Sequence, residues 1–125
     1  MKYQNIDARI EELKEIALQI ISIFDVKEKT TGIGYKLGYA YTYLEALTND
    51  KVRSTALAYD VSISEAYKRQ LIYVIGNLNT WRGNEARAYK LLLKQYLDYF
   101  EGKQNTAKLN ENVSPLWGMI TGVGD

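Results

Sequence analysis

Apolar residues recur along this chain at alternating spacings of four and three, which is the periodicity of one face of an α-helix. The stretches that follow this pattern cover residues 6–24, 31–47, 50–80 and 84–101. No stretch alternates apolar and polar residues with the period of two that is typical of a half-buried strand. The pattern predicts an all-α fold, a four- to five-helix up-down bundle with short connections.

Turn and capping signals separate the helical stretches. Turns are predicted over residues 27–32, 48–50 and 80–83. Residues 50–80 form either one long helix or two, and Ser62 followed three residues later by Glu65 is a capping box that favours two, with a break near Val61. Gly102 stands where a left-handed C-cap residue is expected after the last helix.

The C-terminal residues carry large apolar side chains outside any helical pattern. We therefore predict a helical bundle domain over residues 1–102, and a polar linker plus an apolar docking tail over residues 103–125. Ser114 and Pro115 would open at most a single helical turn, so the tail is otherwise non-helical. A terminus of this composition is expected to bury its side chains against its own domain or a partner. The tail residues expected to bind a partner are Pro115, Leu116, Trp117, Met119, Ile120 and Val123.

The helix predicted over residues 31–47 carries two further rows of partner-binding candidates. Gly34 and Gly38 belong to a row of small residues that would let another backbone approach closely. Tyr35, Tyr39 and Tyr43 form a second row, in a chain with 11 tyrosines among 125 residues. Together with Tyr41 they cannot all face one core, so at least one is expected to be exposed or to meet a partner. The tyrosines expected in the core are Tyr59, Tyr67, Tyr89 and Tyr96.

The composition is poor in catalytic residue types. The chain has no His and no Cys, which removes the commonest general base, the thiol nucleophile and the soft metal ligands. The acidic cluster on the first helix is interleaved with Arg9 and Lys14, and we interpret it as a solvated face and not as a cation site. The members of this cluster are Glu11, Glu12 and Glu15. No enzymatic activity, cofactor, metal or small-molecule substrate is predicted.

No apolar run reaches the roughly 18 residues that a membrane-spanning helix needs, and the first residues do not have the layout of a signal peptide. The expected location is therefore the cytoplasm, or the host cytoplasm or virion if the protein is viral.

Charge is unevenly distributed, although the net charge is only +1. Residues 51–94 hold eight basic and three acidic side chains, while both flanking segments are acidic overall. A basic face on the last two helices would suit nucleic-acid backbone if these helices pack antiparallel. The acidic ends of one copy would equally suit the basic middle of the next. The candidate nucleic-acid contacts are Lys68, Arg69, Arg82, Arg87, Lys90 and Lys94.

These features favour a non-enzymatic structural or assembly subunit that acts through contacts with copies of itself or with a larger assembly. One setting would be a viral or phage particle in which the C-terminal tail docks on a neighbouring subunit. The first alternative is a helical accessory subunit that binds nucleic-acid backbone in a nucleoprotein complex. The second is an inhibitor or immunity-type protein that binds one partner.

Overall fold

The structure, a computed structural model, describes residues 2–31 and 39–103. These residues form five helices and no strand, which confirms the predicted all-α bundle. The helices are α1 (Lys2–Thr31), α2 (Ala40–Leu47), α3 (Lys51–Ala58), α4 (Ile63–Asn77) and α5 (Asn84–Phe100). None of the described helices is both long enough and apolar enough to cross a membrane.

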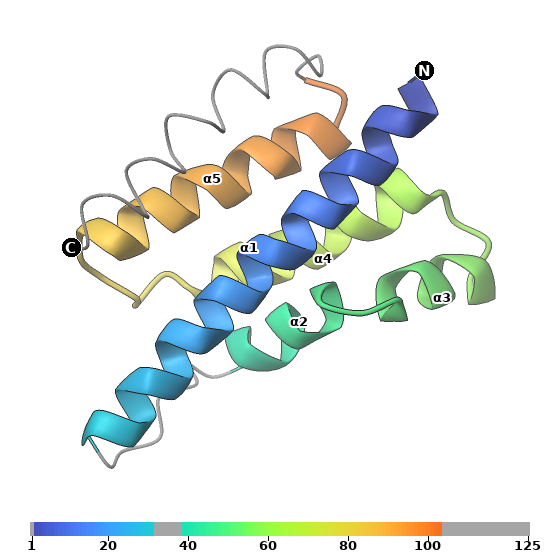
Figure 1. Cartoon of the computed structure of the whole chain (residues 1–125). Coiled ribbons are helices and arrows are strands. Elements are labelled where there is room, and N and C mark those ends of the chain that lie inside the picture. Colours follow the sequence, from blue (N-terminus) through green and yellow to red (C-terminus); the bar gives the residue numbers. More distant parts are fainter. Residues whose placement is uncertain (1, 32–38, 104–125) are drawn as a thin grey trace.

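The long helix α1 runs between α5 on one side and α2 on the other (Figure 1). The Tyr96 hydroxyl of α5 donates to Glu12 of α1 at 2.6 Å. The Tyr89 hydroxyl donates to Gln19 at 2.7 Å, so the two helices are antiparallel. Helices α4 and α5 form a second antiparallel pair, which packs with α2 and α3 on the other side of α4.

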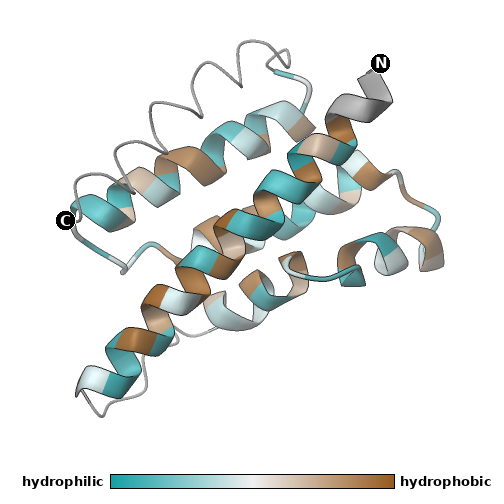
Figure 2. Ribbon diagram, in the orientation of Figure 1, coloured by the Kyte–Doolittle hydropathy of each residue, from teal (hydrophilic) through white to brown (hydrophobic). Residues whose placement is uncertain are grey.

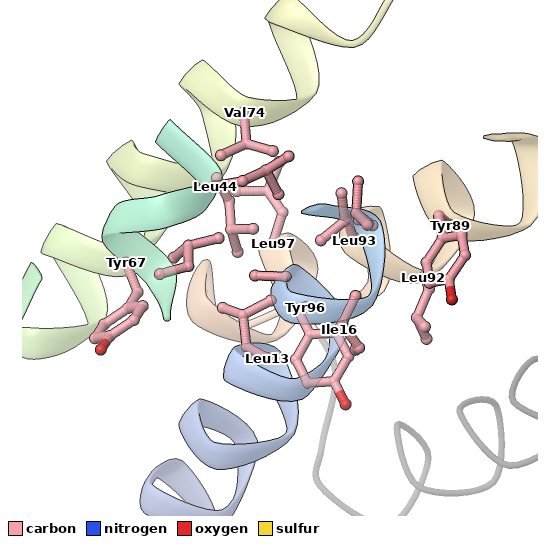
Figure 3. Packing of buried hydrophobic residues seen from close by; sticks show 14 of the residues in the cluster. Leu13, Ile16, Leu44, Tyr67, Val74, Tyr89, Leu92, Leu93, Tyr96 and Leu97 are labelled. Carbon is pink, nitrogen blue, oxygen red and sulfur yellow. The ribbon is translucent and has the colours of Figure 1, made fainter. Parts of the chain in front are cut away.

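The apolar faces of all five helices meet in one core (Figure 2). In Figure 3, Leu13 and Ile16 of α1 converge with residues from α2, α4 and α5. At another level of the core, Phe24 meets Trp81 edge to face, with ring centroids 5.1 Å apart. Removal of these apolar side chains from water is the main favourable contribution to folding. The other labelled core side chains are Leu44, Tyr67, Val74, Tyr89, Leu92, Leu93, Tyr96 and Leu97.

Residues 50–80 form two helices, as the capping signal predicts. The Ser62 hydroxyl accepts a hydrogen bond from the Glu65 backbone N–H at 3.0 Å and caps α4. Asp60 adopts a left-handed conformation, with φ of 55°, which stops the helical path between α3 and α4. Few non-glycine residues adopt this conformation, and Asp is among those that tolerate it best.

The end of α5 also agrees with the prediction. Gly102 has φ of 79°, and its N–H donates to the Tyr99 carbonyl at 3.0 Å. The Lys103 N–H donates to the Asp98 carbonyl at 2.8 Å. This pair of hydrogen bonds is a Schellman motif, which ends the helix and turns the chain away from its axis.

Two expectations are wrong. The predicted turn over residues 27–32 is helical as far as Thr31, because α1 continues as a polar helix where Thr30 donates to the Val26 carbonyl at 3.0 Å. Tyr59, expected in the core, is 75% exposed. Its helix ends at Ala58, so the backbone leaves the helical phase that would have turned Tyr59 inward.

Several predicted partner-binding residues lie outside the described residues. They are Gly34, Tyr35 and Gly38 before α2, and Pro115, Leu116, Trp117, Met119, Ile120 and Val123 in the C-terminal tail.

Candidate protein-binding groove between α2, α3 and α4

A groove of about 570 Å³ opens between α2, α3 and α4. Val52 and Ala66 are buried at its base, while Tyr59 and Tyr73 are exposed at its edges. The remaining lining residues are Thr42, Tyr43, Glu45, Ala46, Asn49, Lys51, Thr55, Val61, Arg69 and Gln70. The groove therefore combines an apolar base with an aromatic and polar edge, which is the usual composition of a binding site.

The groove exists because small side chains meet where three helices converge. Ala46 of α2 and Ala66 of α4 leave space that larger residues would fill. Thr42 and Ala46 continue, at spacings of four, the row of small residues that begins with Gly34 and Gly38. The Gln70 side chain donates to the Tyr43 carbonyl at 2.9 Å and holds α4 against α2 beside the groove.

One edge of the groove is extended by three tyrosines, which we name the tyrosine row: Tyr39, Tyr43 and Tyr73. The rings of Tyr43 and Tyr73 stack with centroids 5.4 Å apart, and those of Tyr39 and Tyr43 lie 6.4 Å apart. Tyr39 is 71% exposed and Tyr73 is 53% exposed. The row thus presents aromatic surface to solvent, in agreement with the expectation that a tyrosine near α2 is exposed.

Charged side chains at the groove come from all three helices. Glu45 belongs to α2, Lys51 to α3 and Arg69 to α4. The Arg69 side chain also donates to Glu65 at 2.7 Å. This hydrogen bond, together with a second one from Lys68, holds the pKa of Glu65 below its usual value. The positive charge of Arg69 is therefore partly compensated before any partner arrives.

The six predicted nucleic-acid contacts do not form one face. Lys68 and Arg69 lie near the start of α4, whereas Arg82 and Arg87 lie at or before the start of α5. Helices α4 and α5 are antiparallel, because Tyr67 near the start of α4 stacks on Phe100 at the end of α5. The start of α4 and the start of α5 therefore lie at opposite ends of the pair. Antiparallel packing therefore separates the two groups of cations and does not join them.

Most of these cations also have partners within the protein. Lys68 pairs with Glu65 at 3.1 Å, and Lys94 pairs with Asp98 at 3.4 Å. The Arg87 side chain donates to Asn84 at 2.9 Å. Lys90 donates to the Trp81 carbonyl, and burial lowers the pKa of this lysine. Lys90 thus ties α5 to the turn that precedes it.

The acidic cluster of α1 divides into two kinds of carboxylate. Glu11 and Glu15 are exposed, as expected for a solvated face. Glu12 instead receives two hydrogen bonds from Arg9, of 2.8 and 2.5 Å, and one from Tyr96. Arg9 is only 4% exposed and the Glu12 side chain is 32% exposed, so Glu12 is only partly solvated. Among the described residues, no group of three or more acidic side chains is placed to hold a metal ion.

The groove itself was not predictable from sequence, because it depends on the relative placement of α2, α3 and α4, although Thr42 and Ala46 of its lining belong to the predicted row of small residues. Only Tyr43 was predicted to bind a partner there, while Tyr59 was assigned to the core. Comparison with protein-family models, curated proteins and solved structures found no match to this chain.

Proposed function

We propose that this protein is a non-enzymatic structural or assembly subunit, and that the groove and the tyrosine row form its contact surface for another protein. The exposed aromatic edge of the groove carries the proposal. Large exposed apolar patches are uncommon on monomeric proteins and mark interaction sites. Tyrosine is enriched at such sites because it offers a large apolar ring and a polar tip at small entropic cost.

A second copy of this chain is the partner that the charges favour. The α3 and α4 sides of the groove belong to the segment that is rich in Lys and Arg, where Lys51 and Arg69 line it. The exposed face of α1 presents Glu11 and Glu15. Surfaces of opposite sign on one molecule steer two copies together and set their relative orientation. Assembly of a viral or phage particle is one setting in which such a subunit would serve.

The mass of the protein in solution tests this proposal. Wild-type protein should form oligomers as its concentration rises, measured by sedimentation equilibrium. The double variant Tyr59→Ser/Tyr73→Ser should associate about tenfold or more weakly, because an aromatic anchor contributes on the order of 1–2 kcal/mol at an interface. Both side chains are exposed, so the helical circular dichroism should not change.

The control is Leu91→Ser, an apolar position on α5 that is 50% exposed and lies outside the groove. This variant should associate as the wild type does. A wild-type protein that remains monomeric at every concentration would contradict self-assembly. A monomer that forms a discrete complex with one different protein would support the inhibitor-type alternative.

The nucleic-acid alternative has less support, because its predicted cations are separated and mostly paired. It makes a distinct prediction, since affinity for nucleic-acid backbone falls steeply as salt is raised. Binding of single-stranded or duplex nucleic acid at low salt, unchanged in the Tyr59→Ser/Tyr73→Ser variant, would favour it over the present proposal.

A further inference from the structure

The outer side of α1 presents a second open surface, which we name the α1 stripe. Its residues recur at spacings of three and four, so they lie on one side of the helix, within an arc of about 80°. All of them are exposed, and Leu18 and Val26 are 48% and 55% exposed. In Figure 1, α1 crosses in front of α4, and no other described helix crosses its outer side. The α1 stripe consists of Ala8, Glu11, Glu15, Leu18, Ser22 and Val26.

The α1 stripe combines carboxylates with apolar side chains. Leu18 follows Glu15 by three residues, about 4.5 Å along the helix axis, so a partner can meet both side chains together. Oε2 of Glu11 lies 3.2 Å from Nζ of Lys14, which compensates part of the charge of Glu11. Glu15 has no ion-pair partner in the part of the chain that the structure describes. The charge of Glu15 is therefore available to another molecule.

The groove between α2, α3 and α4 has the complementary chemistry. Val52 and Ala66 form its apolar base, and the cations of its lining are Lys51 and Arg69. Arg69 already belongs to an ion pair, whereas the exposed Lys51 has no ion-pair partner among the described residues. Glu45 is the acidic member of the described lining, so the lining is basic overall. An uncompensated carboxylate on the α1 stripe thus matches an uncompensated ammonium group at the groove.

The α1 stripe and the groove are separate surfaces of the same molecule. The described lining of the groove comes from α2, α3, α4 and the segments that connect them, and it includes no residue of α1. One copy can therefore offer its α1 stripe to one neighbour and its groove to another. A contact between two different surfaces repeats from copy to copy and generates a ring or a filament, whereas a contact between identical surfaces closes a dimer.

We infer that the α1 stripe of one copy docks in the groove of the next copy, with Leu18 over the apolar base and Glu15 beside Lys51. Tyr59 and Tyr73, at the edges of the groove, enclose Leu18 in this arrangement. A helix whose anchors recur at spacings of three and four is a common occupant of an apolar groove. Opposite charges at the edge fix the orientation of the two copies. The inference rests on the function proposed above, and it adds the surface with which the second copy binds and a head-to-tail arrangement.

Two variants that each lose one surface test the inference when they are mixed. Glu15→Lys/Leu18→Ser disables the α1 stripe, and Tyr59→Ser/Tyr73→Ser disables the groove. All four side chains are exposed, so the helical circular dichroism should not change. An equimolar mixture should form a one-to-one heterodimer at least about tenfold more tightly than either variant associates alone. Native mass spectrometry identifies this species, which should not grow further because its remaining α1 stripe and groove are both disabled.

The matched control makes the same two chemical changes on α5. Leu91→Ser/Glu101→Lys replaces an apolar side chain that is 50% exposed and reverses one exposed carboxylate. Neither residue belongs to the α1 stripe or lines the groove, so this variant should associate as the wild type does. Association as weak as that of Glu15→Lys/Leu18→Ser would overturn the inference, because the loss would not be specific to the α1 stripe.

The mixing result is distinguishable from a failure of the proposed function. Wild-type protein that assembles, together with a mixture that associates as weakly as its separate variants, would overturn the inference and leave the groove as the contact surface. This outcome is expected if two grooves bind each other. Wild-type protein that stays monomeric at every concentration would contradict both the inference and the function on which it rests.

Charge reversal tests the contact between Glu15 and Lys51. Glu15→Lys and Lys51→Glu should each weaken association about threefold at low salt. The double variant Glu15→Lys/Lys51→Glu restores opposite charges and should associate as strongly as the wild type. At about 1 M salt all four proteins should differ little, because charges are then screened beyond about 3 Å. A double variant that associates no more strongly than its single variants at low salt would overturn the assigned contact, and with it the inference.

Discussion

At the scale of single residues, three buried tyrosines illustrate how different surroundings change the role of one side chain. The Tyr96 hydroxyl donates to Glu12, and burial together with this hydrogen bond holds the pKa of Tyr96 far above its usual value. Burial is the largest cause that raises the pKa of Tyr67, whose hydroxyl is buried and has no hydrogen-bond partner. Burial likewise raises the pKa of Tyr89 to about 12.

The contrast between Tyr96 and Tyr67 leads to opposite predictions for the same substitution. Tyr96→Phe should lower the free energy of unfolding by about 1.5–3 kcal/mol, because it removes a hydrogen bond to a charged acceptor. Tyr67→Phe should change stability by about 0 kcal/mol or raise it slightly. Burial of the Tyr67 hydroxyl costs desolvation free energy that no hydrogen bond offsets, and phenylalanine removes this cost. Urea unfolding followed by circular dichroism measures both. Equal losses in the two variants would show that ring packing, and not the hydroxyl, decides stability at these positions.

The sequence predicted the burial of most of these residues but not their hydrogen bonds. Tyr67, Tyr89 and Tyr96 were placed in the core because they fall on helical apolar rows, and all three are buried. Arg9 interleaves with the acidic cluster that was interpreted as a solvated face, yet it is only 4% exposed. Its partner Glu12 also accepts a hydrogen bond from Tyr96, 84 residues later, and local sequence contains no sign of that contact.

At the scale of helices, the sequence predicted the helix ends that carry a capping residue. It did not predict the end of α1, which carries none of these signals. Ser62 and Gly102 carry specific capping chemistry, and helices begin and end beside them. The last turn of α1 carries polar residues without an apolar stripe, so its helical conformation gave no periodic signal. The groove needed the relative placement of α2, α3 and α4, which helical periodicity does not specify.

The cap of α4 provides a test at this scale. Ser62→Ala should lower the free energy of unfolding by about 1 kcal/mol, because the Glu65 backbone N–H loses its acceptor at the start of the helix. Ser64→Ala, two residues further along and inside α4, is the matched control and should be neutral or slightly stabilising, because alanine is the better helix former. Chemical unfolding of both variants makes the comparison. A loss at Ser64 as large as that at Ser62 would contradict the assigned cap.

At the scale of the whole molecule, the tyrosines make stability depend on pH in the alkaline range. The pKa of Tyr41 is raised to about 12 by its hydrogen bond to Asp25 and by burial, and burial raises the pKa of Tyr89 to about 12. The ordinary value is 10.0, so above pH 10 the unfolded chain releases phenol protons that the folded protein keeps. Their contribution is complete below pH 10, and stability falls as pH rises towards 12.

The free energy of unfolding should therefore decrease between pH 10 and 12, measured by urea titration at fixed pH values. Tyr89→Phe removes one of the linked groups and should make the decrease shallower. Tyr59→Phe, a substitution on the exposed surface, is the matched control and should leave the slope unchanged. An identical slope for Tyr89→Phe would mean that the Tyr89 hydroxyl is accessible to solvent in the folded protein.

The contact between Glu12 and Tyr96 spans 84 residues of chain, and this separation sets a delay during synthesis. Helix α1 is made first, but α5, which covers part of its apolar face, follows only after roughly 4–17 s at 5–20 residues per second. The α4–α5 pair, by contrast, joins neighbouring segments and forms as soon as both are available. In that interval the uncovered face of α1 is available to other nascent chains and to chaperones. The period in which the protein is most open to aggregation is therefore set by the 84 residues that separate Glu12 from Tyr96.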